Sequence, residues 1–174
     1  MIAMLLKIKR MLIQWLEWML IVAVAVLVAD VVWGVFSRYL LGHQSGWTEE
    51  LARVLLIWVG LLGSSVAFGI KGHLGVDALV VRMAPGARRL LAVLVHLVVI
   101  FFAASVLIGG GSQLVRETFR LEQQMIAIPI PKAWVYMAIP ISGVFTILFS
   151  LELIVETWRG GAQAQPAKAP GDIT

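Results

Sequence analysis

The chain has no cysteine and few charged residues. Among its 174 residues, Asp, Glu, Lys and Arg make up 14%, whereas 60% are hydrophobic. The lack of cysteine excludes disulfides, thiolate metal sites and cysteine nucleophiles. The scarcity of charge excludes an ordinary soluble domain, which needs more charged residues to cover its surface. Together with a mean hydropathy of +0.93, these shortages indicate a protein whose solvent is largely the lipid bilayer.

Sequence signatures of catalysis and of nucleotide binding are also missing. The chain contains no Gly-rich phosphate loop, no nucleophile elbow and no metal-binding helix motif. His96 is the only histidine well inside an apolar run, whereas haem binding would need paired histidines on facing helices. The formal charge of +4 comes from basic residues beside apolar runs, a pattern that indicates orientation in a membrane and argues against nucleic acid. We therefore expect no enzyme activity, no cofactor and no metal.

Four apolar runs are long enough to cross a membrane. The hydrocarbon core needs about 20 residues of helix, and backbone groups in lipid must be paired within the helix itself. The first run continues well past a signal-peptide core of roughly 7–15 residues, so it is predicted to be an uncleaved helix. The expected fold is an all-α integral membrane protein with one domain over residues 1–158 and a disordered tail over 159–174. The expected spans are 13–36, 51–70, 90–110 and 133–155.

Basic residues predict how these spans are oriented. Most of the 14 Lys and Arg residues flank the ends that share a side with the N-terminus. The positive-inside rule places that side in the cytoplasm, so both termini are expected inside. Between the second and third spans, apolar residues from Leu74 to Met83 recur at helical spacing. This pattern predicts a short helix lying in the membrane interface.

The densest group of polar residues begins the second span. Thr48 is placed to cap a helix, and Glu49 and Glu50 would occupy the first turn, where the helix dipole favours anions. Glu49 and Arg53 are four residues apart and can pair along one face. A well-formed helix start accounts for this group; a docking or assembly surface and a proton relay are the alternatives. Trp58 lies deep in the same span and indicates contact with a partner.

Ionisable residues inside the spans fall into two sets by depth. At a rise of about 1.5 Å per residue, Asp30 and Arg53 lie at one level on the outer side. His96 and Glu152 lie at one level on the cytoplasmic side. The matched depths predict two polar contacts between helices. Ion translocation is the alternative, and it would need further polar groups between the two levels.

Short motifs along nearly the whole chain follow a known order. Ser37-Arg38-Tyr39 comes first, the group from Trp47 to Trp58 follows, and Gly72-His73 with Asp77 comes next. This series resembles the small membrane subunit (DctQ-like) of tripartite ATP-independent periplasmic (TRAP) transporters. The residues that we expect to serve assembly or docking are Arg38, Trp47, Glu49, Glu50, Arg53, Trp58, His73 and Asp77.

The resemblance implies partners and a role. Such a subunit is embedded in membrane lipids and binds a large permease subunit, which holds the substrate and sodium sites. A periplasmic substrate-binding protein delivers an organic acid to this pair. The small subunit then acts as a fixed scaffold. Two other functions stay open: a self-sufficient exporter of the small multidrug type, and a membrane anchor of a redox enzyme.

Overall fold

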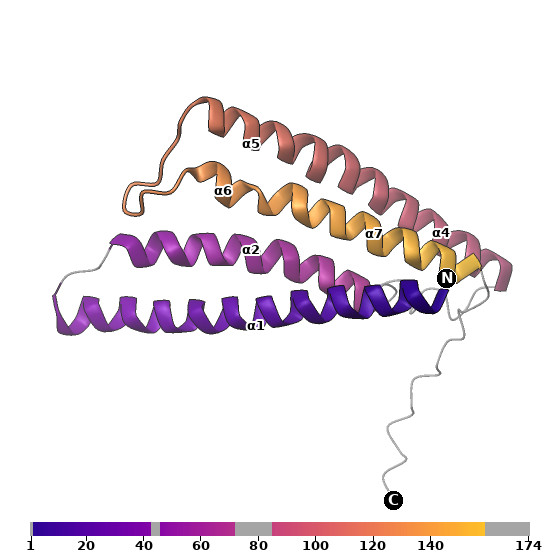
Figure 1. Ribbon diagram of the computed structural model, residues 1–174, viewed down its shortest axis with the longest axis horizontal. Helices are drawn as coiled ribbons and strands as arrows, with labels where there is room; N and C mark the ends of the chain where they lie inside the picture. The colour runs from indigo at the N-terminus through magenta and orange to yellow at the C-terminus, as the bar shows by residue number, and fades with distance from the viewer. Residues whose placement is uncertain (1, 43–45, 72–84, 159–174) are drawn as a thin grey trace, which may run out of the picture.

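The described residues form mainly long helices that lie side by side (Figure 1). The structure is a computed structural model that describes residues 2–42, 46–71 and 85–158. The third apolar run is one continuous helix made of three parts, the middle one a π-helix, and the fourth run is made of two parts. In chain order the elements are α1 (Ile2–Leu40), α2 (Gly46–Lys71), α4 (Pro85–Phe102), the π-helix η1 (Ala103–Gly110), α5 (Gly111–Arg120), α6 (Lys132–Tyr136) and α7 (Ala138–Trp158).

The four predicted spans are confirmed as helices that can cross a membrane. They are longer than the sequence suggested, and they run over Met11–Leu40, Gly46–Ile70, Leu90–Arg120 and Lys132–Val155. The largest difference is in the third helix, which we expected to end at residue 110. Gly110 (φ −64°, ψ −43°) and Gly111 (φ −61°, ψ −44°) both have helical backbone angles, so the helix continues as far as Arg120. The predicted interfacial helix lies outside the described residues.

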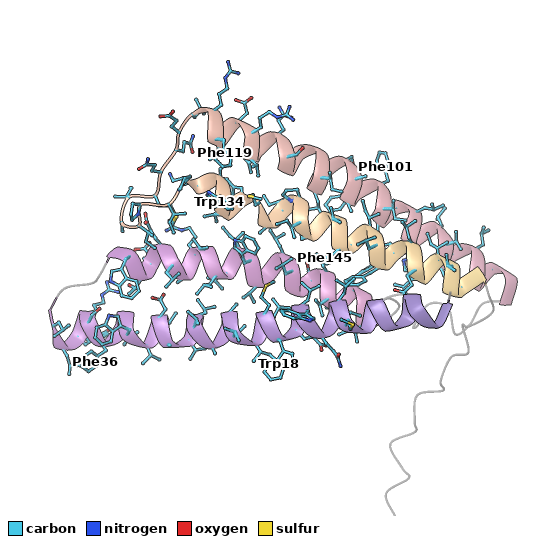
Figure 2. The ribbon with its side chains drawn as sticks, in the orientation of Figure 1. Trp18, Phe36, Phe101, Phe119, Trp134 and Phe145 are labelled. Carbon is cyan, nitrogen blue, oxygen red and sulfur yellow. The ribbon has the colours of Figure 1, made fainter. Side chains whose placement is uncertain are left out.

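The helices form an open layer. α1 packs against α2, α2 against α7, and α7 against α4 and η1, and they lie side by side in that order in Figure 1. Among the described helices, α1 packs extensively against α2 alone. Figure 2 shows Trp18 and Phe36 on α1 pointing away from the other helices. Broad apolar faces are therefore left for lipid or another protein to cover.

The contact between α2 and α7 holds the middle of the layer. Leu62 and Val66 on α2 pack with Phe149 on α7 and Leu16 on α1 in a buried apolar cluster. Beside this cluster, the Ser65 hydroxyl oxygen lies 3.1 Å from the Ser142 carbonyl oxygen and 3.1 Å from the Thr146 hydroxyl oxygen. Polar contacts of this kind join helices where the hydrophobic effect is weak.

Glycines let neighbouring helices approach closely. A Cβ atom added at Gly69 would lie 2.9 Å from the Phe149 ring, and one at Gly143 would lie 2.8 Å from the Leu107 Cβ on η1. A separation below 3.0 Å is too short for a real Cβ contact. Close backbone approach at small residues is a common way for membrane helices to pack. These two glycines therefore set the spacing of α7 from both of its neighbours.

Candidate functional site

Glu50 joins the start of α2 to the connection between α5 and α6. Its Oε1 accepts a hydrogen bond from the Ile126 backbone N–H at 2.8 Å. Its Oε2 accepts bonds from the N–H groups of Ala127 at 2.8 Å and Ile128 at 3.0 Å. Because the acceptor is ionised, such bonds are shorter and stronger than neutral ones. Glu50 therefore has an internal role, holding a connection more than seventy residues away in the sequence.

The connection that Glu50 binds is an ordered hairpin. We call residues 123–132 the α5–α6 hairpin. The Lys132 N–H donates to the Gln123 carbonyl oxygen at 2.9 Å, and the Met125 N–H donates to the Ile130 carbonyl oxygen at 3.1 Å. Ile126 stands at its apex with 96% of its surface exposed. The hairpin therefore presents an apolar side chain at the end of the molecule where α2 begins (Figure 1).

Glu49 and Arg53 form the ion pair that their spacing predicts. Arg53 Nη2 donates to Glu49 Oε1 at 3.1 Å, and the two side chains are 63% and 65% exposed for Arg53 and Glu49 respectively. Glu49 and Glu50, although adjacent in sequence, thus point to different partners. The exposed pair is open to a partner protein, whereas the carboxylate of Glu50 is engaged within the chain.

The predicted contact between Asp30 and Arg53 is wrong. Asp30 is only 5% exposed, and both of its carboxylate oxygens are buried without a hydrogen-bond partner among the described residues. Asp30 and Ala52 line the same shallow groove between α1 and α2, so the predicted level is close to the observed one. Arg53 is on a more exposed face of α2, where Glu49, one turn away, binds it. The depth along a helix was predictable, but the face was not.

The groove between α1 and α2 brings several predicted residues together. Arg38 and Tyr39 line it from α1, and Thr48 and Glu49 line it from α2. Trp47 is exposed beside them at the start of α2. This end of the molecule therefore carries most of the described docking candidates.

Trp58 lies elsewhere. It is half-buried and packs against the cluster of Leu16, Leu62, Val66 and Phe149. Contacts within the chain therefore account for part of its indole ring, and a contact with a partner stays a prediction.

The second predicted polar contact joins His96 and Glu152. His96 is buried on α4, and its ring meets Phe68 of α2 edge-on, with centroids 5.8 Å apart and an interplanar angle of 87°. Glu152 is half-buried on α7. A contact between His96 and Glu152 stays a prediction. His73 and Asp77 lie outside the described residues.

Two functional features escaped sequence reasoning. The partners of Glu50 are backbone N–H groups, which leave no residue-type signal, and only the short polar-to-apolar connection with Pro129 and Pro131 hinted at a fixed conformation. The second feature is Ser65, a small polar residue within an apolar span. Its neighbours on α7, Ser142 and Thr146, are four residues apart and share a helical face, which was a readable signal.

These features define a multi-pass membrane protein whose polar contacts lie between helices and at their ends. Residues 27–160 match the family model described as tripartite ATP-independent periplasmic transporters, DctQ component. The match covers more than half of the chain, so the protein belongs to this family. It is therefore a transporter component and not a member of an enzyme family.

Relatives agree with this assignment. The chain is 28% identical over 150 residues to the sialic acid TRAP transporter small permease protein SiaQ of Vibrio cholerae serotype O1, covering 86% of this chain and 85% of the relative. It is 26% identical over 148 residues to a putative TRAP transporter small permease protein of Haemophilus influenzae, covering 83% and 88%. It is also 26% identical over 156 residues to the sialic acid TRAP transporter permease protein SiaT of H. influenzae, covering 88% of this chain but 24% of that longer protein.

Proposed function

We propose that this protein is the scaffold subunit of a sodium-coupled TRAP transporter. It binds a large permease subunit in the bacterial inner membrane and does not itself bind the transported solute. The solute is an organic acid carried as its carboxylate and delivered by a periplasmic binding protein. The N- and C-termini lie in the cytoplasm, so the α5–α6 hairpin and the Glu49–Arg53 pair lie at the periplasmic end.

The observation that carries this proposal is the open layer of helices. α1 packs extensively against α2 alone among the described helices, and apolar side chains such as Val28, Phe101 and Leu148 stay exposed along the spans. Lipid covers some of this surface. A four-helix protein that worked alone would gain more from closing into a bundle, which covers polar groups as well as apolar ones.

The relative SiaT gives further support. A segment similar to nearly all of this chain makes up 24% of that permease protein. A unit of this kind therefore occurs there within a longer permease polypeptide. This arrangement is expected when the unit works in contact with the rest of a permease.

Reconstitution in liposomes tests the proposal. The chain is purified alone and together with its large permease subunit, and uptake of labelled sialic acid and of a panel of other carboxylates is measured with the binding protein outside. We expect uptake only from the complete set, and only with an inward sodium gradient. Replacing sodium with potassium should abolish it. Uptake or efflux by this chain alone would overturn the scaffold role, and uptake without sodium would overturn the coupling.

A further inference from the structure

The two halves of the layer meet along one line of contact. We call this line, where α2 faces α6 and α7, the α2 seam. α2 packs closely against α7 but only slightly against α6. The seam is therefore well packed along α7 and thinly packed at the end where α2 and α6 begin. That end is where the α5–α6 hairpin crosses over to α2 (Figure 1).

Besides the apolar cluster of Leu62, Val66 and Phe149, two specific contacts hold the seam, and they lie far apart. One is at Ser65 and Gly69, where α2 touches Ser142, Thr146 and Phe149 of α7. The other is at Glu50, which binds the hairpin. At about 1.5 Å per residue, Glu50 and Ser65 are about 22 Å apart along α2. In the contact at Ser65 and Gly69, hydroxyl groups are buried among apolar side chains. The contact at Glu50 is at the surface.

The second contact depends on a single side chain. Glu50 supplies the acceptor for all three hydrogen bonds to residues 126–128. The apex otherwise approaches α2 at Gly46, where an added Cβ atom would lie 3.6 Å from the Ala127 Cβ, an ordinary van der Waals distance. Without the carboxylate, little else in the described contacts ties the hairpin to α2.

We propose that Glu50 is a latch that closes the hairpin end of the α2 seam, while the contact at Ser65 and Gly69 acts as a fixed pivot. Releasing the latch frees the α5–α6 hairpin and lets α6 move away from the start of α2. The helices themselves and the pivot stay intact. The latch is a property of this chain alone, and it goes beyond the scaffold role without depending on it.

Spin-label distances measure the seam directly, because the chain has no cysteine and introduced cysteines are labelled without background. One label pair replaces Trp47 on α2 and Trp134 on α6, both exposed, and reports the latch end. A second pair replaces Ile70 on α2 and Leu151 on α7, also exposed, and reports the pivot. Both pairs are measured in the full chain in lipid nanodiscs.

The test variant is Glu50→Gln, and its matched control is Glu49→Gln in the same helical turn. An amide of the same size keeps one acceptor oxygen but turns donors toward the remaining N–H groups. We expect the Trp47–Trp134 distance distribution to broaden and shift to longer distances in Glu50→Gln and to stay unchanged in Glu49→Gln. The Ile70–Leu151 distribution should stay narrow in both. An unchanged Trp47–Trp134 distribution in Glu50→Gln, or equal broadening of both pairs, would overturn the proposal.

Hydrogen exchange supplies a second measurement. Losing a charge-assisted hydrogen bond should speed exchange of the Ala127 and Ile128 amides about tenfold or more, with no change at the amides of α7. If Glu50→Gln does not fold, Ile126→Pro removes the backbone N–H that donates to Glu50 Oε1. Ile126→Ala is its control, because the Ile126 side chain is almost fully exposed. Faster exchange at Ala127 and Ile128 in the proline variant alone supports the latch, and equal rates in the two variants contradict it.

Discussion

At the scale of single residues, Asp30 is the least expected feature. A carboxyl group buried without a hydrogen-bond partner costs free energy, because it gives up its hydration and receives nothing in return. Asp30 is in this position between α1 and α2, with both oxygens buried. Burial of Asp30 therefore destabilises the isolated chain. Natural sequences retain destabilising residues where these serve a purpose other than stability.

Replacing Asp30 should therefore stabilise the isolated chain. We expect Asp30→Leu to raise the free energy of unfolding in detergent by about 1–3 kcal/mol, measured by thermal or SDS unfolding. Asp30→Asn, which keeps an unsatisfied polar group, is the matched control and should change less. A lower unfolding temperature for the leucine variant would show that the Asp30 carboxyl group stabilises the isolated chain, and would contradict this prediction.

Ser65 gives the opposite case, a polar residue that is fully used. Its hydroxyl group contacts α7 as well as the Leu61 carbonyl oxygen of its own helix. Among the described residues, the neighbouring Ser64 hydroxyl donates only to that Leu61 carbonyl oxygen. Ser65→Ala should lower the free energy of unfolding by about 0.5–1.5 kcal/mol, the usual size of a polar contact between membrane helices. Ser64→Ala should have almost no effect in the same unfolding assay. Equal effects of the two substitutions would mean that the contact with α7 contributes nothing.

At the scale of helices, small residues decide where neighbours come close. Gly69 on α2 faces the Phe149 ring, while Gly60, on an exposed part of the same helix, has nothing near its missing side chain. Glycine is otherwise a poor residue for a helix interior. Its use at position 69 is explained by packing, whereas its use at position 60 is not explained by any contact among the described residues.

Adding a methyl group at each site should distinguish the glycine that packs against a neighbouring helix from the glycine that does not. Gly69→Ala is expected to cost about 1–3 kcal/mol, because the α2–α7 pair must move apart. Gly60→Ala should leave the stability of the isolated chain unchanged or slightly raised, by up to about 1 kcal/mol, since alanine favours the helix. Both values come from unfolding in detergent. If Gly60→Ala lowered the free energy of unfolding as much as Gly69→Ala does, the close approach of α2 and α7 would not explain the cost at position 69.

At the scale of the whole molecule, the open layer and the exposed Glu49–Arg53 pair are the surfaces that we propose for assembly. An exposed ion pair adds little to the stability of a fold. If Arg53 contacts the large permease subunit, its charge matters for assembly and not for folding. The pair lies with Arg38 and Trp47 at the same end of the layer, so a partner contacting one would be near all of them.

Charge reversal at Arg53 tests this assembly surface. Arg53→Glu should reduce co-purification with the large subunit and reduce uptake in the reconstituted system, with little change in unfolding of the isolated chain. The control combines Glu49→Arg with Arg53→Glu, which restores an ion pair inside the helix. We expect the combined variant to stay impaired. Full recovery would mean that only the internal pair matters, and normal assembly of Arg53→Glu would remove Arg53 from the surface.

The fold class followed from the sequence because apolar runs of sufficient length must be helices in lipid. Helix ends were less predictable. The third helix continues through Gly109–Gly111 because α7 packs against it there, with an added Cβ at Gly111 only 2.8 Å from Ile139. Local sequence signals a possible helix end at three glycines, whereas contact with a neighbour holds the helical conformation.

The candidate site was predictable where its contacts are local. The Glu49–Arg53 pair follows from a spacing of four residues in a helix, and it is present. The Asp30–Arg53 contact, inferred from matched depth, is absent. Depth gives only the position of a side chain along its helix, whereas the rotation of the helix about its axis decides which neighbour the side chain faces. The hairpin contact of Glu50 was missed because its acceptors and donors come from parts of the chain that no local pattern connects.

The amino-acid sequence was sufficient to predict the four helices that, among the described residues, are able to cross a membrane. Unpaired backbone is excluded from lipid, which leaves helices as the only solution for such apolar runs. The tertiary structure alone decided which face of each helix meets a neighbour. That choice depends on where glycines, hydroxyl groups and one carboxylate bring distant segments together. Lipid is as apolar as a leucine-rich helix, so hydrophobicity does not mark these contacts in the sequence, and only the packed helices show them.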